Sequence, residues 1–194
     1  MTDSVTWKIG GEAGFGIMSA GIMLSRAFAR AGYHTFSTNE YPSLIRGGHN
    51  VITVRIATYK FESMNRDVHI LIALNKQTIE FHKNDLNENA LVVFDPDDAQ
   101  LTPEDFPKPV KLLPVPLREL VRKTHGEPIT RNTVALGATV ALMGVPFESL
   151  ESVIRDQFKK KGEEVVKSNA DIARVGYDFV KQTFAGEQSI FLNA

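Results

Sequence analysis

The chain has 194 residues, of which 43% are hydrophobic and 23% are charged, with a formal net charge of −1 and no cysteine. These values predict a single soluble, cytoplasmic domain over residues 1–194, because they suit one core and show no membrane-spanning run, secretory signal or basic nucleic-acid-binding surface. The lack of cysteine excludes disulfides, a cysteine nucleophile, thiolate zinc sites and cysteine-ligated iron–sulfur clusters within the chain.

The first forty residues alternate strand and helix patterns. Residues 5–9 form a short apolar run that ends in a glycine cluster, and apolar residues then recur at helical spacing over 17–31. Residues 33–38 follow as a second strand. A strand, a glycine turn, a helix and a strand in this order indicate the opening of a parallel α/β sheet.

The rest of the chain continues this alternation with one interruption. Residues 39–50 are polar and predict a loop, and segment 58–67 is expected to form part of a hairpin. Seven of the nine prolines lie between residues 96 and 128, so this stretch is predicted to be extended apart from one edge strand. The other predicted elements are strands at 51–57, 68–74 and 90–94, the edge strand at 110–115, and helices at 75–83, 130–143, 147–160 and 163–184.

Together the predicted elements indicate the α/β class, with three α/β/α layers around a mostly parallel, mixed sheet. Either Thr130 or Asn132 is expected to cap the helix at 130–143, because both side chains carry an oxygen that accepts a backbone N–H.

A glycine-rich turn, Gly11-Glu12-Ala13-Gly14-Phe15-Gly16, joins the first predicted strand to the first helix. Glycine allows positive φ and close approach of a ligand, and the free N–H groups at a helix start favour a phosphate or carboxylate. The spacing differs from the dinucleotide fingerprint, and no Lys-Ser or Lys-Thr follows as in a nucleotide-hydrolase phosphate loop. A tight turn that binds no ligand is the alternative.

A second dense patch covers residues 40–50 and combines an acid, a phenol, a hydroxyl, an arginine, an imidazole and an amide. Arg46 can bind a phosphate or carboxylate through two hydrogen bonds, and Gly47 and Gly48 leave space beside it. The alternative is a surface loop in which Arg46 pairs with Glu40. Both patches are expected to follow the C-terminal ends of adjacent strands, so they are predicted to line one crevice.

The sequence offers no catalytic constellation. The five histidines lack a metal-ligand spacing, so each is expected to be a surface or packing residue. The acidic group Asp95, Asp97 and Asp98 is expected to be a solvated turn rather than a cation site. The chain is therefore predicted to be a binding module or one part of an enzyme that other chains complete.

Three segments resemble the gamma subunit or gamma domain of 2-oxoacid:ferredoxin oxidoreductases of the pyruvate, 2-oxoglutarate and ketoisovalerate type. They are Gly10-Gly11-Glu12-Ala13-Gly14-Phe15-Gly16-Ile17, then Tyr41-Pro42-Ser43 with Arg46-Gly47-Gly48-His49-Asn50, and Asn132-Thr133-Val134-Ala135-Leu136-Gly137-Ala138. The resemblance extends over nearly the whole chain. Many members carry a glycine where this chain has Ala13 and a glutamine where it has Phe15. The Glu-Ala-Gly version looks most like gamma domains fused to the N-terminus of an alpha subunit.

The resemblance implies a reaction in which a 2-oxoacid, coenzyme A (CoA) and oxidised ferredoxin give an acyl-CoA, CO2 and reduced ferredoxin. It implies that thiamine diphosphate, Mg and iron–sulfur clusters lie in partner chains or domains, and that the isolated chain is inactive. The implied partners are the alpha and beta thiamine-binding chains and a ferredoxin-type subunit or ferredoxin, with no membrane or nucleic acid.

By position, the resemblance implies that this chain contributes CoA binding and assembly contacts. The implied CoA-contacting residues are Gly11, Glu12, Gly14, Gly16, Ser43, Arg46, Gly47, Gly48 and Asn50. Three alternatives stay open. The first is that loop 41–50 faces a partner chain near the thiamine site. The second is that the chain is a stand-alone nucleotide- or CoA-binding module, and the third is that it is the gamma domain of the related indolepyruvate oxidoreductase.

Overall fold

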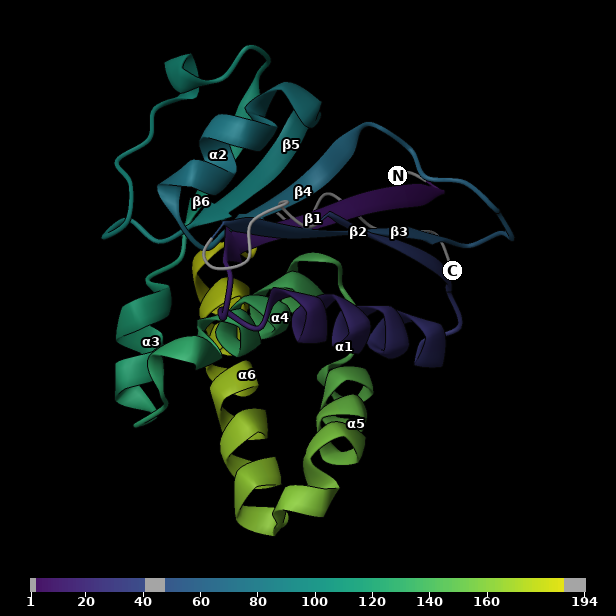
Figure 1. Ribbon diagram of the computed structural model, residues 1–194, viewed down its shortest axis with the longest axis vertical. Coiled ribbons are helices and arrows are strands. Elements are labelled where there is room, and N and C mark those ends of the chain that lie inside the picture. Colours follow the sequence, from purple (N-terminus) through teal and green to yellow (C-terminus); the bar gives the residue numbers. More distant parts are fainter. Residues whose placement is uncertain (1–2, 41–47, 187–194) are drawn as a thin grey trace.

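The computed structural model describes residues 3–40 and 48–186, which fold around a six-stranded sheet (Figure 1). The strands are β1 (Ser4–Glu12), β2 (His34–Glu40), β3 (His49–Ala57), β4 (Val68–Ala73), β5 (Leu86–Phe94) and β6 (Val110–Pro114). The helices are α1 (Ile17–Arg30), α2 (Lys76–His82), α3 (Leu117–Lys123), α4 (Arg131–Leu142), α5 (Phe147–Phe158) and α6 (Glu163–Thr183). Each of these elements except α3 corresponds to a segment that the sequence predicts.

The sheet is mixed, with strand order β2-β3-β1-β4-β5-β6. β1 pairs in parallel with β4, β4 with β5 and β5 with β6, whereas β3 runs antiparallel to both β1 and β2. Parallel pairs outnumber antiparallel ones, so the predicted mostly parallel, mixed sheet is confirmed.

Two predictions about strand neighbours are wrong. β2 does not lie beside β1, because β3 inserts between them with an unbroken register from Ser4 opposite Ala57 to Glu12 opposite His49. Segment 58–67 forms no hairpin, since β1 lies between β3 and β4. Neighbouring strands are about 4.8 Å apart, so a connection of this length can cross one strand.

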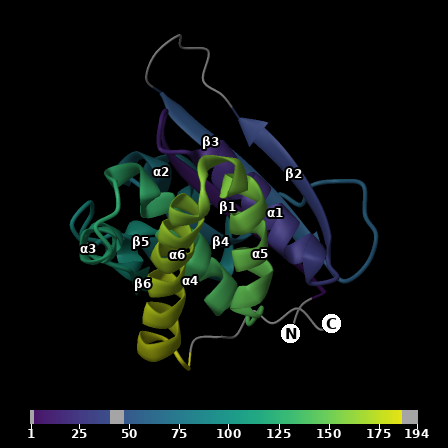
Figure 2. The ribbon, with the colours of Figure 1, turned by 90° about the horizontal axis from the view of Figure 1, so that it is seen from below.

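Helices cover the two faces of the sheet unequally. Figures 1 and 2 show α1, α4, α5 and α6 gathered on one face, where the large side chains of Trp7, Phe28 and Phe147 are fully buried. The Trp7 indole N–H donates to Thr139 Oγ1 on α4 at 3.0 Å, which satisfies its one polar atom within the core. This face holds the larger hydrophobic core.

The opposite face is covered in part by α2, which contacts β1 and β4, and a smaller core on this face includes Leu71, Ile79 and Val92. Nearer the β2 edge the same face carries the buried polar residues Thr6, Lys8 and Thr53. The predicted three α/β/α layers are therefore present, with one helical layer much thinner than the other (Figure 1).

Helices α4 and α6 are in backbone contact. A Cβ at Gly137 would collide with the Ala173 carbonyl, and a Cβ at Gly176 would collide with the Val134 carbonyl. Glycines from both helices therefore allow α4 to lie in the centre of the helical layer, with all of its residues buried.

The proline-rich stretch contains a helix that the sequence analysis misses. α3 begins directly after Pro116, where proline costs no helix hydrogen bond, and it packs Leu120 and Val121 into the core. The predicted edge strand is confirmed as β6, which ends at Pro114.

None of the helices in the described ranges is long and apolar enough to cross a membrane.

Candidate functional site

The glycine turn follows the carboxyl end of β1. Gly14 has φ 96° and Gly16 has φ 67°, a left-handed conformation that favours glycine. Gly16 occupies the N-cap of α1, and no side chain caps the first turn of that helix. A Cβ at Gly14 would meet nothing within 4 Å, so the backbone there faces open space. Gly11, by contrast, is buried within β1, and Glu12 is exposed.

The second patch meets this turn through β3. Asn50 lies opposite Gly11 in the β1–β3 register, and the Gly48 carbonyl accepts a hydrogen bond from the Ala13 N–H at 3.0 Å. The two patches therefore meet as predicted, at residues 48–50 of the second patch. Its predicted cause is wrong, because the strand that brings the patches together is β3 and not a neighbouring β2. The candidates Ser43, Arg46 and Gly47 lie outside the described residues.

The start of α4 holds the glycine turn from the other side. The Asn132 amide donates to the Phe15 carbonyl at 2.9 Å, and the Arg131 guanidinium lies over the Phe15 ring, 4.6 Å from its centroid. Either Thr130 or Asn132 was expected to cap α4, and neither side chain does so. Thr130 stands at the N-cap position, but its hydroxyl donates to the Glu127 carbonyl instead of capping the helix.

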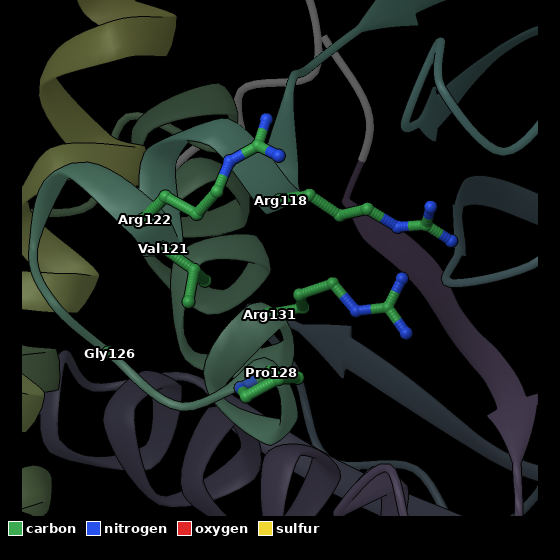
Figure 3. A pocket seen from close by; sticks show the side chains of 6 residues that line it. All are labelled: Arg118, Val121, Arg122, Gly126, Pro128 and Arg131. Carbon is green, nitrogen blue, oxygen red and sulfur yellow. The ribbon is translucent and has the colours of Figure 1, made fainter.

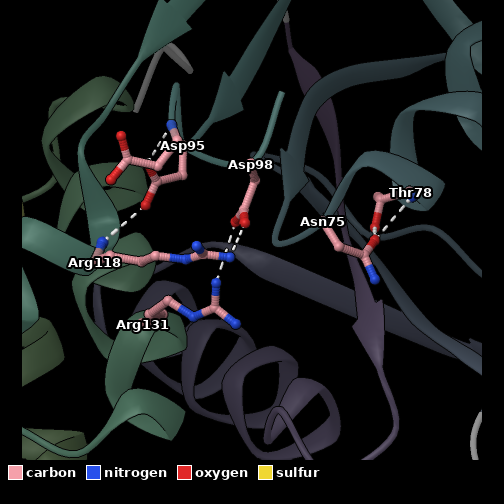
Figure 4. Close-up of polar contacts among 7 residues, drawn as sticks. Asn75, Thr78, Asp95, Asp98, Arg118 and Arg131 are labelled. Carbon is pink, nitrogen blue, oxygen red and sulfur yellow. Dashed lines mark hydrogen bonds and ion pairs between the residues drawn. The ribbon is translucent and has the colours of Figure 1, made fainter. Parts of the chain in front are cut away.

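Asp95 and Asp98, two of the three acidic residues after β5, form a hydrogen-bonded junction, so the predicted solvated turn is wrong for these two, whereas Asp97 is exposed. Asp95 is fully buried and accepts backbone N–H bonds from Asp97 at 3.0 Å and from Arg118 at 2.8 Å (Figure 4). Asp98 pairs with both Arg118 and Arg131. Because two guanidinium groups share the Asp98 carboxylate, this junction ties β5 to α3 and α4.

A cavity of about 360 Å³ adjoins this junction. It is lined by Arg118, Val121, Arg122, Gly126, Pro128 and Arg131 (Figure 3). The guanidinium groups of Arg118 and Arg131 extend in the same direction, and that of Arg122 stands apart from them (Figure 3). Burial, and then the neighbouring Arg118 cation, lower the pKa of Arg131, whereas Asp95 opposes this shift.

The sequence analysis misses this cavity because it misses α3. Arg118 and Arg122 lie on α3, which was not predicted because the surrounding prolines indicate extended chain. Arg131 lies on α4, which was predicted from the spacing of its apolar residues alone. One signal was available, since three arginines occur within fourteen positions after a strand that ends at the same edge as the glycine turn.

Two histidines predicted to be scattered lie together on the thinly covered face. His49 and His82 have their Nε2 atoms 3.1 Å apart, and His82 Nδ1 lies 3.0 Å from Asp85 Oδ2. Lys8 donates to the same Asp85 oxygen at 2.8 Å. The sequence analysis does not foresee that these two histidines contact each other.

Burial suppresses the charge on both imidazoles. Burial first, and then the His82 and Lys8 charges, lower the pKa of His49 from 6.5 to about 4. Burial also lowers the pKa of His82, although its hydrogen bond with Asp85 opposes the shift. For Asp85 burial favours the neutral acid, but hydrogen bonds from Lys8 and His82 outweigh it and lower its pKa. Among residues 3–40 and 48–186, no cluster of His, Cys, Asp or Glu is suited to hold a metal ion.

Comparison with protein families gives a match over most of the chain. A family model described as "Pyruvate ferredoxin/flavodoxin oxidoreductase" matches residues 6–179. The chain is 30% identical to ketoisovalerate oxidoreductase subunit VorA of Methanothermobacter thermautotrophicus, over 93% of this chain and 37% of VorA. It is 26% identical to 2-oxoglutarate synthase subunit KorC of Archaeoglobus fulgidus, over 92% of this chain and 89% of KorC.

Among solved structures, the chain is similar to 2-oxoglutarate:ferredoxin oxidoreductase from Magnetococcus marinus, which has 2-oxoglutarate, CoA and succinyl-CoA bound. The TM-score is 0.85 at 27% identity, over 94% of this chain and 32% of that chain. This chain spans about a third of the length of the first curated relatives that it matches, 34% to 37%.

Proposed function

The chain belongs to the pyruvate ferredoxin/flavodoxin oxidoreductase family, and we propose that it acts as the gamma-type part of a 2-oxoacid:ferredoxin oxidoreductase. In that role it works within a complex that converts a 2-oxoacid and CoA to an acyl-CoA and CO2 and reduces ferredoxin. The similarity to KorC over nearly the whole of both chains supports a role as one separate part of such a complex. The family match does not favour a stand-alone nucleotide-binding module.

The chain's contribution in this proposal is to bind CoA. The observation that carries it is the position of the arginine-lined cavity beside the glycine turn, at the carboxyl edge of the parallel strands β1, β4 and β5. Open α/β sheets bind ligands at this edge. The structure from Magnetococcus marinus, which is similar to this chain, has CoA bound, which supports CoA as the ligand.

The residues present fit the phosphates of CoA. Open space over Gly14 and the uncapped first turn of α1 suit a phosphate group, since free N–H groups and the helix dipole both favour an anion. Arg131 lies between this turn and the cavity. In the reaction CoA supplies the thiol that accepts the acyl group, and the part of this chain is to hold its nucleotide end.

The other assignments are proposals of the same kind. In this proposal alpha-type and beta-type partners hold thiamine diphosphate and Mg, and the complex acts in the cytoplasm. The iron–sulfur clusters belong to partners as well, because this chain has no cysteine to hold one. Ser43, Arg46, Gly47, Gly48 and Asn50 stay predicted CoA contacts, with a partner-facing role as the alternative for their loop.

A pair of glycine substitutions tests the CoA site in the assembled complex. Gly14 and Gly32 lie before and after α1, both have positive φ, at 96° and 92°, and a Cβ at either would meet nothing within 4 Å. Alanine therefore costs each site about 1–2 kcal/mol of backbone strain. We expect only Gly14→Ala to raise the KM for CoA, by about tenfold for each 1.4 kcal/mol of binding lost, with the KM for the 2-oxoacid unchanged.

The readout is reduction of a viologen dye by the complex with a 2-oxoacid and varied CoA. Equal effects of Gly14→Ala and Gly32→Ala on the KM for CoA would show that the glycine turn does not bind CoA.

A further inference from the structure

The two edges of the sheet differ in how they resist the addition of a further strand. β6 begins directly after Pro109, ends at Pro114 and carries Lys111, and prolines and lysines are devices that block pairing at an edge. β2 is seven residues long and has neither a proline nor a lysine, and it pairs with β3 in an unbroken register from His34 to Glu40. The β2 edge therefore lacks the protection that the β6 edge has.

Within the described ranges β2 pairs with β3 alone, and Figure 2 shows it at the outer edge of the sheet. Of its seven side chains only Thr35 and Thr38 are partly buried, and the other five are exposed. One of these is Phe36, which is 39% exposed. An edge strand has a row of backbone N–H and C=O groups turned away from its neighbour, so β2 can accept another strand along its whole length.

The sequence of β2 is complementary to itself when two copies run antiparallel. A two-fold axis at Ser37 places His34 opposite Glu40 of the second copy, and the axis repeats this contact at the other end of the strand. Phe36 then lies opposite Thr38. Opposite charges, and an aromatic beside a β-branched side chain, are favourable pairs across antiparallel strands. An axis at Ser37 is also the one position that pairs every residue of β2 with a residue of β2.

From this arrangement we propose that β2 is a dimerisation edge, at which two copies of this chain pair antiparallel about Ser37 and join their two sheets into one. This assembly closes after two chains, because the contact uses the same edge of each copy. Pairing of β2 with the β6 edge of another copy would instead continue without end, and the prolines of β6 oppose it. The dimer brings together two gamma-type parts and does not depend on CoA binding.

Introduced cysteines test the contact, since the full chain has no cysteine of its own. Residues directly opposite each other in an antiparallel pair have Cβ atoms about 4.5–5.5 Å apart, close to the roughly 3.5–4.5 Å of a disulfide. We expect mild oxidation to link Ser37→Cys chains into a covalent dimer, read by mass spectrometry without reductant. Ser168→Cys, at an exposed position on α6, is the matched control and should stay monomeric.

The proposal is overturned if Ser37→Cys forms no covalent dimer, or if Ser168→Cys forms as much of it. The same oxidation of the assembled complex identifies the partner. A link from Ser37→Cys to a different chain would show that a partner strand, and not a second copy, covers this edge.

A charge exchange tests the register. In His34→Glu two carboxylates face each other at both ends of the strand pair, so we expect the dimer dissociation constant to rise about tenfold in sedimentation equilibrium. His34→Glu combined with Glu40→Lys puts opposite charges back in place, and we expect it to restore the wild-type value. A monomeric wild type, or a double variant that dimerises no more tightly than His34→Glu, would contradict pairing about Ser37.

Discussion

The side-chain amide of Asn132 donates a hydrogen bond to the Phe15 carbonyl, with 2.9 Å between nitrogen and oxygen. The Asn132 carbonyl oxygen in turn accepts from the Thr133 hydroxyl at 2.9 Å, which fixes the orientation of the amide. A Cβ at Gly16 would collide with this amide, so the turn needs glycine there for space as well as for its positive φ. The start of α4 thus determines the shape of a turn that lies more than a hundred residues earlier.

Replacing Asn132 by aspartate is expected to weaken both folding and CoA binding. A carboxylate cannot donate to the Phe15 carbonyl and adds a negative charge beside the proposed phosphate site, so we expect a loss of about 1–3 kcal/mol in the free energy of unfolding. Urea unfolding and the KM for CoA measure the two effects. Asn169 also donates from its amide to a backbone carbonyl at 2.9 Å, on α6. A rise in the KM for CoA with Asn169→Asp as large as that with Asn132→Asp would argue against a specific role for Asn132.

Replacing Asp98 by asparagine is expected to lower stability and strengthen CoA binding. The largely buried Arg131 loses its ion-pair partner, which costs about 3–5 kcal/mol when a buried pair is broken. Arg118 and Arg131 then become available to phosphate, so the variant is expected to bind CoA more tightly. Its CoA affinity is also expected to decrease more steeply as salt is added. Calorimetry at two salt concentrations checks this. Loss of CoA binding by an Asp98→Asn complex that remains folded would mean that Asp98 positions the arginines for the ligand.

Adding a methyl group between α4 and α6 is expected to unfold much of the helical layer. In Gly137→Ala the new Cβ collides with the Ala173 carbonyl, a backbone atom that cannot move without shifting α6. We expect a loss of about 3 kcal/mol or more in the free energy of unfolding. Gly186→Ala is the control, because a Cβ there meets nothing within 4 Å. Similar urea midpoints for the two variants would contradict the close helix contact.

Acidification is expected to destabilise the fold through the His49–His82 pair. The pKa of His49 falls from 6.5 to about 4 on folding, and that of His82 falls as well. The folded state therefore resists protonation. The stability that these histidines contribute is fully present above pH 6.5 and is lost as the pH falls from about 6.5 toward 4. The groups facing the pair are Lys8, Asp85 and, more distantly, Glu40.

Urea unfolding of the wild type and of His49→Asn between pH 8 and pH 5 measures this dependence. We expect the variant to lose less stability over the range than the wild type does. His34→Asn, at an exposed position on β2, is the control. A pH dependence that is unchanged in His49→Asn would show that the histidine pair is not its source.

Most elements of the fold could be predicted from the sequence because their cause is local. α1 and α6 follow from apolar residues at helical spacing, and β6 follows from prolines that confine a strand to the sheet edge. α3 could not, since its seven residues lie within a stretch whose prolines favour extended chain. The insertion of β3 between β1 and β2 depends on long-range pairing, which local patterns do not record.

The candidate site was predictable in part for the same reason. The glycine turn has a sequence signal because Gly14 and Gly16 need positive φ. The hydrogen bond from Asn132 on α4 to the glycine turn has no such signal, because an asparagine at the start of a helix is equally typical of a helix cap. The pairing of His49 with His82 likewise arises only when β3 and α2 meet.

The most direct test of the account is hydrogen exchange of the assembled complex with and without CoA, followed by mass spectrometry. We predict that CoA slows exchange in two segments of this chain, residues 13–20 at the glycine turn and residues 118–131 around the arginine-lined cavity. Helix α5, far from both along the chain, should be unaffected. If CoA protects neither segment, or protects α5 equally, the central claim that this chain binds CoA at the carboxyl edge of its sheet is contradicted.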